Sequence, residues 1–245
     1  MKNNKSLGQH WLKNRAILDE IAELSGEGGL CVEIGPGLGT LTASLLRRFD
    51  KVLAIEFDAK LAENLPKSFP GKNLEVVNVD FLKYDLDSIE APYVIAGNIP
   101  YYITSPIIEK ILKTKNLPKR VVLLMQKEVA ERIVSEKESV LSLMVKNRAE
   151  VKLGPVVLRD EFTPPPKVDS QVLIMEPKAP EVGDDVFKLI KMGFSSPRKK
   201  VAHNIATLKS KSEILEIFEK VGINADARPA DLNLEDWQNL FNELK

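Results

Sequence analysis

The sequence is poor in the residues that build disulfide frameworks and metal centres. It contains one cysteine and two histidines in 245 residues. A single cysteine excludes an internal disulfide, and its place inside an apolar run predicts that Cys31 is a buried core thiol. His10 and His203 are far apart in the sequence, so no cluster of metal ligands is predicted and no metal is expected in the chemistry.

The chain also lacks long apolar runs. No stretch approaches the roughly 20 residues needed to cross a bilayer, and the N-terminus has no apolar signal core. We therefore expect a cytoplasmic protein without a membrane partner. The composition, 44% hydrophobic and 29% charged, provides enough apolar side chains for a folded core and is not that of a disordered chain.

Net charge is absent as well, since the 35 basic and 35 acidic residues cancel. The cations are nevertheless grouped in two segments that contain no acid. These are residues 1–18, with Lys2, Lys5, Lys13 and Arg15, and residues 186–212, with Lys188, Lys191, Arg198, Lys199, Lys200, Lys209 and Lys211. Such grouping is typical of a surface that binds a nucleic-acid backbone. A solvated helix face gives the same pattern, so charge alone leaves both interpretations open.

A glycine-rich turn follows the first apolar run. Residues 30–34 predict a buried strand, and Gly35, Gly37 and Gly39 precede an amphipathic helix. Strand, glycine turn and helix form the opening unit of a nucleotide-binding α/β fold, in which glycines let the backbone approach the ligand. The G-x-G-x-G spacing differs from the pyrophosphate fingerprint, and Glu33 stands just before it. This favours a ligand that lacks phosphates and carries a charged amino-acid portion.

Two more acids stand near the ends of predicted strands. Glu56 ends the apolar run 52–55, and Asp80 ends the run 74–79 and precedes Phe81. An acid at the tip of the second strand can accept hydrogen bonds from both ribose hydroxyls. We expect Glu56 to bind a ribose, Asp80 to accept a hydrogen bond from an adenine amino group, and Phe81 to pack against the adenine ring.

The most distinctive chemistry lies in Asn98, Ile99, Pro100 and Tyr101, which follow the apolar run 93–96. They should lie at the carboxyl end of a strand, where open α/β sheets bind ligands. Asn98 offers an amide oxygen, Pro100 turns neighbouring carbonyls outward, and Tyr101 supplies a flat aromatic face. Acceptors beside an aromatic plate suit a nucleobase held by its edge and stacked on its face. An ordinary strand-to-helix turn has similar residues, so the motif alone decides nothing.

Two strands, predicted at residues 151–158 and 170–175, flank a loop with three consecutive prolines. These stiff prolines hold Phe162 in place, where it can face the Asn98 loop as the second half of a base sandwich. Beyond a linker at 177–184, only helical patterns remain, at about 185–194, 198–208, 212–221 and 233–243. We therefore predict an α/β domain over residues 1–178 and a small all-α domain over residues 179–245.

Several segments together resemble one enzyme family. They are residues 7–12, 32–42, 54–58, Asp80, and residues 98–101, 126–129 and 162–170. From residue 5 to about residue 208, the sequence is similar to the ribosomal RNA adenine dimethyltransferase family. The resemblance implies a Rossmann-like methyltransferase fold that uses S-adenosylmethionine (SAM). This fold has a seven-stranded mixed sheet with one antiparallel strand, and a helical C-terminal domain follows it.

The resemblance also implies an activity and partners. SAM methyl groups are transferred to the N6 atoms of two adjacent adenosines near the 3′ end of small-subunit rRNA, in an immature 30S particle, by a monomeric protein. Matching motifs place His10, Leu12, Gly35, Glu56, Asp80 and Asn98 at the cofactor, and Gln9, Glu33, Gly37 and Phe81 complete the candidate set. Lys5, Lys127, Arg198, Lys199 and Lys200 are the candidate RNA contacts. Trp11 departs from the family pattern, which usually has Phe there.

The candidate catalytic residues follow from the chemistry of adenine N6, whose lone pair is delocalised into the ring. The sulfonium methyl of SAM is already electrophilic, so no strong nucleophile has to be generated. Hydrogen bonds from N6 to the Asn98 side chain and to the Ile99 or Pro100 carbonyl favour a tetrahedral nitrogen aimed at the methyl. Stacking on Tyr101, together with Phe162, fixes the flipped base.

Three other functions are considered. A macrolide-resistance methyltransferase performs the same chemistry on large-subunit rRNA, but the full loop at 162–170 and the basic residues after Pro197 favour the small-subunit enzyme. A non-catalytic nucleic-acid-binding relative is disfavoured by the intact residues 98–101. A NAD-dependent dehydrogenase is disfavoured by the glycine spacing and by the lack of a proton-relay residue.

Overall fold

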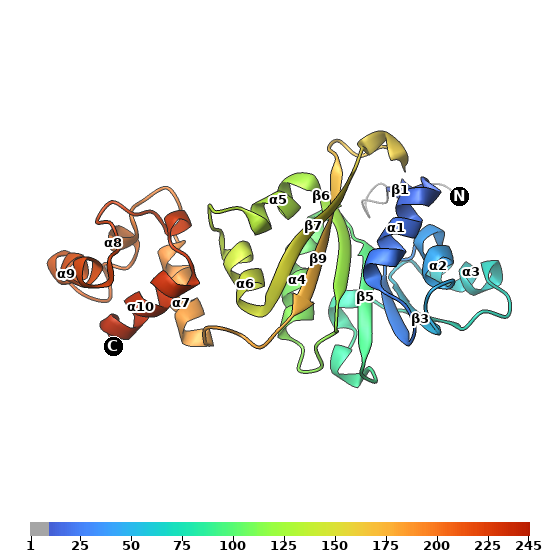
Figure 1. The fold of residues 1–245 in the computed structure, drawn as a ribbon, viewed down its shortest axis with the longest axis horizontal. Coiled ribbons are helices and arrows are strands. Elements are labelled where there is room, and N and C mark those ends of the chain that lie inside the picture. Colours follow the sequence, from blue (N-terminus) through green and yellow to red (C-terminus); the bar gives the residue numbers. More distant parts are fainter. Residues whose placement is uncertain (1–9) are drawn as a thin grey trace. The chain divides into compact units, whose positions relative to one another are not determined.

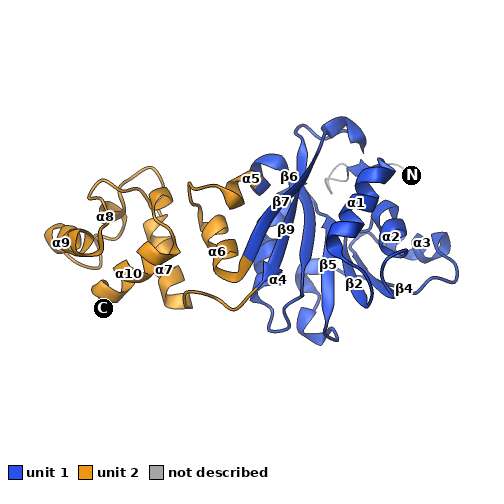
Figure 2. Cartoon of the chain, viewed as in Figure 1, with its two compact units in different colours: residues 1–130, 150–177 blue, residues 131–149, 178–245 orange. Residues whose placement is uncertain are grey.

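The computed structural model describes residues 10–245, which fold into two compact units (Figure 2). Unit 1 comprises the described part of Met1–Ala130 together with Glu150–Pro177, and unit 2 comprises Glu131–Ala149 and Lys178–Lys245. The last boundary, between residues 177 and 178, lies where the sequence predicts a linker. The prediction of an uninterrupted first domain differs at residues 131–149, which belong to unit 2 because Leu143 packs into the apolar core of that unit.

Figure 1 labels the main elements along the chain. The strands are β1 (Trp11–Leu12), β2 (Leu30–Ile34), β3 (Lys51–Glu56), β4 (Leu74–Asn78), β5 (Tyr93–Asn98), β6 (Val121–Gln126), β7 (Ala149–Val157), β8 (Phe162–Thr163) and β9 (Ser170–Pro177). The α-helices are α1 (Arg15–Ser25), α2 (Thr40–Leu45), α3 (Ala59–Asn64), α4 (Thr104–Lys113), α5 (Lys127–Val134), α6 (Val140–Arg148), α7 (Asp184–Gly193), α8 (Val201–Asn204), α9 (Lys211–Val221) and α10 (Leu234–Leu244). Short 3-10 helices are η2 (Pro66–Ser68), η3 (Phe81–Lys83), η4 (Leu86–Ser88), η5 (Tyr101–Ile103), η6 (Arg159–Glu161) and η7 (Pro229–Asp231).

Unit 1 is built on a seven-stranded sheet in the order β4-β3-β2-β5-β6-β9-β7. Strands β4, β3, β2, β5 and β6 pair in parallel, and β9 pairs antiparallel with β6. This arrangement confirms the expected seven-stranded mixed sheet. The chain first leaves β2 toward β3 and later returns to its other side as β5. The carboxyl ends of β2 and β5 therefore form a topological switch point, where such sheets bind ligands.

Burial on both faces explains the long apolar runs of the central strands. All of Val121 to Met125 in β6 is fully buried, as expected for a strand covered on both sides. Helices α1 and α2 pack together, and the core cluster joins Leu18 and Leu41 to Cys31 of β2. The cysteine is fully buried, which confirms its prediction as a core thiol.

A second, two-stranded sheet ties the N-terminal arm to the loop before β9. β1 pairs antiparallel with β8, with Trp11 opposite Thr163 and Leu12 opposite Phe162. The N–H of Lys13 continues this contact by donating to the carbonyl of Glu161 at 3.1 Å. The arm is therefore held against unit 1 by pairing with residues about 150 positions away in the chain.

Unit 2 is helical, and capping side chains fix where its helices begin. Ser139, Ser210 and Asn233 form capping boxes at the starts of α6, α9 and α10. The predicted helix at 198–208 is wrong in extent, since α8 spans only Val201–Asn204. Beyond α8 the backbone closes in tighter turns, in which the N–H groups of Ala206 and Leu208 donate to the carbonyls of His203 and Ile205, three positions before them. Within residues 10–245, no helix combines the length and apolar character that spanning a membrane requires.

Candidate active site

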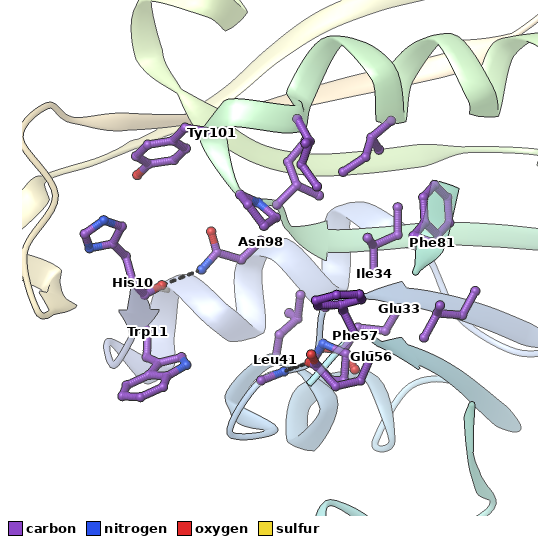
Figure 3. A pocket seen from close by; sticks show the side chains of 18 of the residues that line it. His10, Trp11, Glu33, Ile34, Leu41, Glu56, Phe57, Phe81, Asn98 and Tyr101 are labelled. Atoms are coloured by element: carbon purple, nitrogen blue, oxygen red, sulfur yellow. Dashed lines mark hydrogen bonds between the residues drawn. The ribbon is translucent and has the colours of Figure 1, made fainter. Parts of the chain in front are cut away.

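A cavity of about 250 Å³ opens at the carboxyl edge of the sheet (Figure 3). Its wall combines the glycine turn after β2, the ends of β3 and β5, and the arm residues that follow the undescribed N-terminus. The predicted site residues that line it are His10, Leu12, Glu33, Gly35, Gly37, Glu56, Asp80, Phe81, Asn98, Ile99, Pro100 and Tyr101. The structure therefore brings together residues that the sequence places up to 91 positions apart.

The backbone conformation of the glycine turn requires glycine at two positions. Gly35 and Gly37 adopt φ values of 62° and 57°, in the left-handed region that disfavours residues with a Cβ. At Gly37 space is also short, because an added Cβ would lie 3.1 Å from Nε1 of Trp11. The turn thus presents bare backbone to the cavity, as the sequence predicts.

Glu56 ends β3 with its carboxylate held on both oxygens. The N–H of Gly37 donates to Oε2 at 3.0 Å and the N–H of Asp58 donates to Oε1 at 2.8 Å. Burial raises the pKa of Glu56, while these backbone hydrogen bonds act in the opposite direction. The carboxylate is therefore fixed in place at the cavity and retains lone pairs for hydroxyl donors of a ligand.

Glu33 lies deeper, with only 1% of its surface exposed. The hydroxyl of Thr42 on α2 donates to its Oε2 at 2.6 Å. Burial raises the pKa of Glu33 to about 8; hydrogen bonds from the hydroxyl and from the backbone of Thr42 lower it, and the nearby charge of Glu56 raises it further. The carboxyl group is consequently protonated in most molecules at neutral pH.

Asp80 and Phe81 line the cavity beyond β4. The Asp80 carboxylate caps η3 by accepting the N–H of Leu82 at 2.9 Å, and it keeps further acceptor capacity for a ligand amino group. Phe81 is buried directly beside it. An acceptor next to an apolar ring suits one edge of an adenine.

Asn98 is oriented by the N-terminal arm. Its Nδ2 donates to the carbonyl of His10 at 3.0 Å, which assigns the amide nitrogen to the arm. In Figure 3 the amide oxygen lies on the other side, toward Tyr101. The ring of His10 is fixed in turn, because its Nδ1 lies 2.8 Å from the carbonyl of Pro164 and must donate to it.

Two backbone carbonyls follow Asn98. The Pro100 carbonyl already accepts the N–H of Ile103 at 3.3 Å, in the turn that begins η5. Ile99 is buried and its own N–H donates to Leu124. Both residues line the cavity, and the Pro100 carbonyl has one of its two lone pairs engaged in this turn.

Tyr101 is rigidly placed by two contacts. Its hydroxyl lies 2.6 Å from Oγ of Ser170, and its ring stacks on that of His10 with centroids 5.9 Å apart and planes 17° from parallel. Burial raises the pKa of Tyr101, so its hydroxyl stays protonated. A ring fixed in this way is a preformed aromatic plate, with one face turned to His10.

Phe162 is not brought to the cavity. Only 2% of its surface is exposed, and it packs in the core cluster that contains Leu12 and Val172. Its pairing with Leu12 in the small sheet turns the side chain inward. The second face of the predicted base sandwich is therefore not formed by Phe162 in this structure.

The candidate RNA contacts lie outside the cavity lining. Lys127 begins α5, and its N–H donates to the carbonyl of Asp169. Arg198, Lys199 and Lys200 are exposed in unit 2, but they precede α8 instead of starting a long helix. Lys200 is ion-paired with Asp226. Gln9 and Lys5 lie outside the described residues.

Several contacts were missed by sequence reasoning. Thr42 supports Glu33, and Ser170 supports Tyr101 across 69 positions of sequence. Phe57 and Tyr102 line the cavity while remaining mostly exposed. Thr42 had a local signal, since it lies on the helix that follows the glycine turn; the Ser170 contact depends on strand pairing and had none.

The donor and acceptor set fits SAM. Exposed backbone at the glycine turn, a fixed carboxylate at Glu56, and the Asp80–Phe81 pair match an amino-acid tail, a ribose and an adenine in that order. When bound, SAM supplies an electrophilic methyl group. The amide oxygen of Asn98 beside Tyr101 forms a separate group of contacts suited to the edge and face of a base.

Comparisons with known proteins agree with this assignment. The family model described as ribosomal RNA adenine dimethylase matches residues 1–245. The ribosomal RNA small subunit methyltransferase A of Nostoc sp. (strain PCC 7120) is 36% identical, over 100% of this chain and 98% of its own.

Solved structures extend the likeness to three dimensions. A dimethyladenosine transferase from Plasmodium falciparum has a TM-score of 0.81 at 30% identity, covering 96% of this chain and 98% of that one. The 23S rRNA methyltransferase ErmE has a TM-score of 0.78 at 27% identity, covering 96% and 99%. With its whole length matched and its cavity residues in place, the chain belongs to the ribosomal RNA adenine dimethylase family.

Proposed function

We propose that this enzyme transfers methyl groups from SAM to the N6 atoms of two adjacent adenosines of small-subunit rRNA. One observation carries the proposal: Asn98 is anchored through Nδ2 to the carbonyl of His10, which leaves its amide oxygen next to Tyr101 at the cavity. An anchored amide cannot rotate to present its NH₂ to the ligand. It therefore offers an acceptor to an amino group, as methylation of adenine N6 requires.

The cofactor contacts are assigned to groups whose positions are fixed before SAM binds. Glu56 binds the ribose hydroxyls, since two backbone N–H groups hold its oxygens. Asp80 accepts the adenine amino group, with Phe81 against the ring. His10 and Leu12 close the cavity from the arm, and Gly35 and Gly37 let the backbone contact the amino-acid portion. Preorganised groups of this kind need no reordering on binding.

The base contacts act on the geometry of N6. In the first transfer the Asn98 amide oxygen and the Ile99 carbonyl accept its two N–H groups, and in the second transfer one of them accepts the N–H that remains, so the nitrogen turns pyramidal and its lone pair points to the methyl. Tyr101 holds the flipped base by stacking, and its hydrogen bond to Ser170 keeps the ring from rotating away. The proton that leaves N6 after transfer passes to solvent.

The finer assignments concern partners. The substrate is rRNA in an immature small-subunit particle, and the protein acts on it as a monomer in the cytoplasm. Exposed Arg198 and Lys199 in unit 2, with Lys127 at α5, contact phosphates of the RNA. The name of the Nostoc relative, which refers to the small subunit, supports this choice.

Methylation of large-subunit rRNA is the second candidate function, because ErmE is a structural neighbour. The test supplies labelled SAM with unmethylated small-subunit particles in one reaction and large-subunit rRNA in another, and maps methylated nucleotides by mass spectrometry. We expect two adjacent adenosines of small-subunit rRNA to gain two methyl groups each, and Asn98→Ala to modify both far more slowly. Methylation confined to large-subunit rRNA would establish the second candidate instead.

A further inference from the structure

Two aromatic side chains stand exposed at the cavity. Of the large apolar side chains at the surface of residues 10–245, Tyr102 and Phe57 are the most exposed, at 64% and 62%, and they are the only aromatic ones. Both residues line the cavity. Apolar surface that is left in water at a binding cavity is typical of a contact that a ligand completes.

The neighbours of these two rings assign them to different ligands. Phe57 directly follows Glu56, and in Figure 3 its ring lies near that carboxylate and away from Tyr101. Tyr102 directly follows Tyr101 in η5, next to the residues that we propose hold the target base. Phe57 therefore belongs to the cofactor side of the cavity, and Tyr102 belongs to the RNA side.

The two tyrosines of η5 differ in how the protein holds them. Tyr101 is fixed by Ser170 and by the ring of His10. No hydrogen bond or ring contact from the described part of the chain holds the side chain of Tyr102. Successive residues of a 3-10 helix project about 120° apart, so the two rings do not face each other across a single base. Tyr102 is therefore available to a base other than the one on Tyr101.

The substrate provides such a base. When one adenosine of an adjacent pair is flipped into the cavity, its neighbour loses a stacking partner at the cavity mouth. We propose that Tyr102 stacks on the second adenosine of the pair while the first occupies the cavity. This inference rests on the proposed methylation of two adjacent adenosines. Tyr102 thus positions the substrate strand and takes no part in the bonds that form and break.

Substitution of Tyr102 gives the first test. Tyr102→Ala should lower kcat/KM on small-subunit particles by roughly 5- to 100-fold at one adenosine or both, which is the range for a lost base–aromatic stack. Tyr102→Phe keeps the ring and should restore a rate close to that of wild type. Leu158→Ala is the control, because it truncates a side chain of similar exposure outside the cavity lining. A wild-type kcat/KM for Tyr102→Ala overturns the proposal.

A double-mutant cycle between protein and RNA identifies the base that Tyr102 contacts. Particles are reconstituted with rRNA in which one adenosine of the pair is replaced by an abasic nucleotide, in two versions, and methylation of the remaining adenosine is measured. In at least one version the missing base should slow the wild-type enzyme about as much as Tyr102→Ala slows it on intact particles. Combining both changes should add no further loss, because each removes the same contact. Losses that multiply in both versions contradict the proposal.

Calorimetry with SAM shows that the variant is folded and excludes a cofactor role. Tyr102→Ala should bind SAM with wild-type affinity, and a weakened affinity would make Tyr102 a cofactor contact and overturn the proposal. Failure of the proposed function has a different outcome, since the wild-type enzyme then leaves both adenosines of intact particles unmethylated. Methylation of both adenosines that does not respond to Tyr102→Ala refutes this inference alone.

Discussion

The carboxyl edge of the sheet in unit 1 and the core of unit 2 fill their interiors in opposite ways. At the edge, the buried groups include the carboxyls of Glu33 and Glu56, beside turns with positive φ. In unit 2 the fully buried Trp237 packs directly on Gly193 among apolar side chains. Buried carboxyls oppose folding, whereas close apolar packing favours it. The comparison teaches that the buried carboxyls of unit 1 lie at a cavity, whereas Glu138, a buried carboxyl of unit 2, forms an ion pair with Lys146.

The largest expected effect concerns how the free energy of unfolding of unit 1 depends on pH. The folded state raises the pKa of Glu33 from 4.5 to about 8. It therefore binds the Glu33 proton more tightly than the unfolded chain does. The stability that this proton provides is present below pH 4.5 and is lost as pH rises to 8, at up to about 1.4 kcal/mol per pH unit. Urea unfolding at pH 5 to 8 should show wild type losing stability relative to Glu33→Gln. A constant difference would mean that Glu33 is already ionised in the folded protein.

Asn98→Ala should lower methyl transfer by roughly 100-fold, because N6 loses the acceptor that orients it. Single-turnover measurements on small-subunit particles separate this loss from RNA binding, which should change little. Asn73→Ala is the matched control, since Asn73 precedes β4 and donates to Asp50 away from the cavity. A wild-type rate for Asn98→Ala would remove Asn98 from the chemistry.

Glu56→Gln should weaken SAM binding. The amide NH₂ that replaces one oxygen then faces a backbone N–H, of Gly37 or of Asp58, and the ribose acceptor is disturbed. A lost hydrogen bond to a charged group corresponds to about 1.5–3 kcal/mol, or roughly 10- to 150-fold in affinity. Calorimetry against Glu75→Gln, which alters an exposed acid on β4, provides the comparison. Unchanged affinity would refute the ribose assignment.

Gly193→Ala tests the packing of unit 2, because the new Cβ would lie 2.1 Å from Cη2 of Trp237. Overpacking of this kind typically costs about 1–3 kcal/mol. Gly183→Ala is the control in the same unit, since its added Cβ meets no atom within 4 Å. Trp237 fluorescence in a Trp11→Phe background reports the unfolding of unit 2 by itself. SAM affinity should stay unchanged, which would show that the two interiors are independent.

The smallest effect is expected at the surface of unit 2. Replacing Arg198, Lys199 and Lys200 by Ala should flatten the dependence of log affinity for small-subunit particles on log salt. Each phosphate contact contributes a slope of roughly 0.7–0.9. Lys200 already pairs with Asp226, so we expect a change of about 1.5 to 2, below that of three free cations. Lys67→Ala is the control, because it removes an exposed lysine of η2 in unit 1. Identical slopes would show that the segment is only a solvated face.

Local sequence patterns were sufficient to predict where several strands and helices lie. Glu56 and Asn98 end their strands as predicted, because an apolar run followed by a polar residue marks the end of a buried strand. The helix expected at about 185–194 is α7, Asp184–Gly193. The prediction for 198–208 was wrong in extent because the residues after α8 form turns with bonds between positions three apart, and the apolar periodicity does not distinguish such turns from a longer helix.

The sequence by itself determined the glycine turn, and the acids and amide at the strand ends, because these depend on neighbouring residues. Only the tertiary structure decided that Phe162 turns into the core, that residues 131–149 join unit 2, and that the His10 carbonyl anchors Asn98. Each of these depends on which distant segments pair, as β1 does with β8. Burial and the pKa of Glu33 follow from the same long-range contacts, and no local pattern contains them.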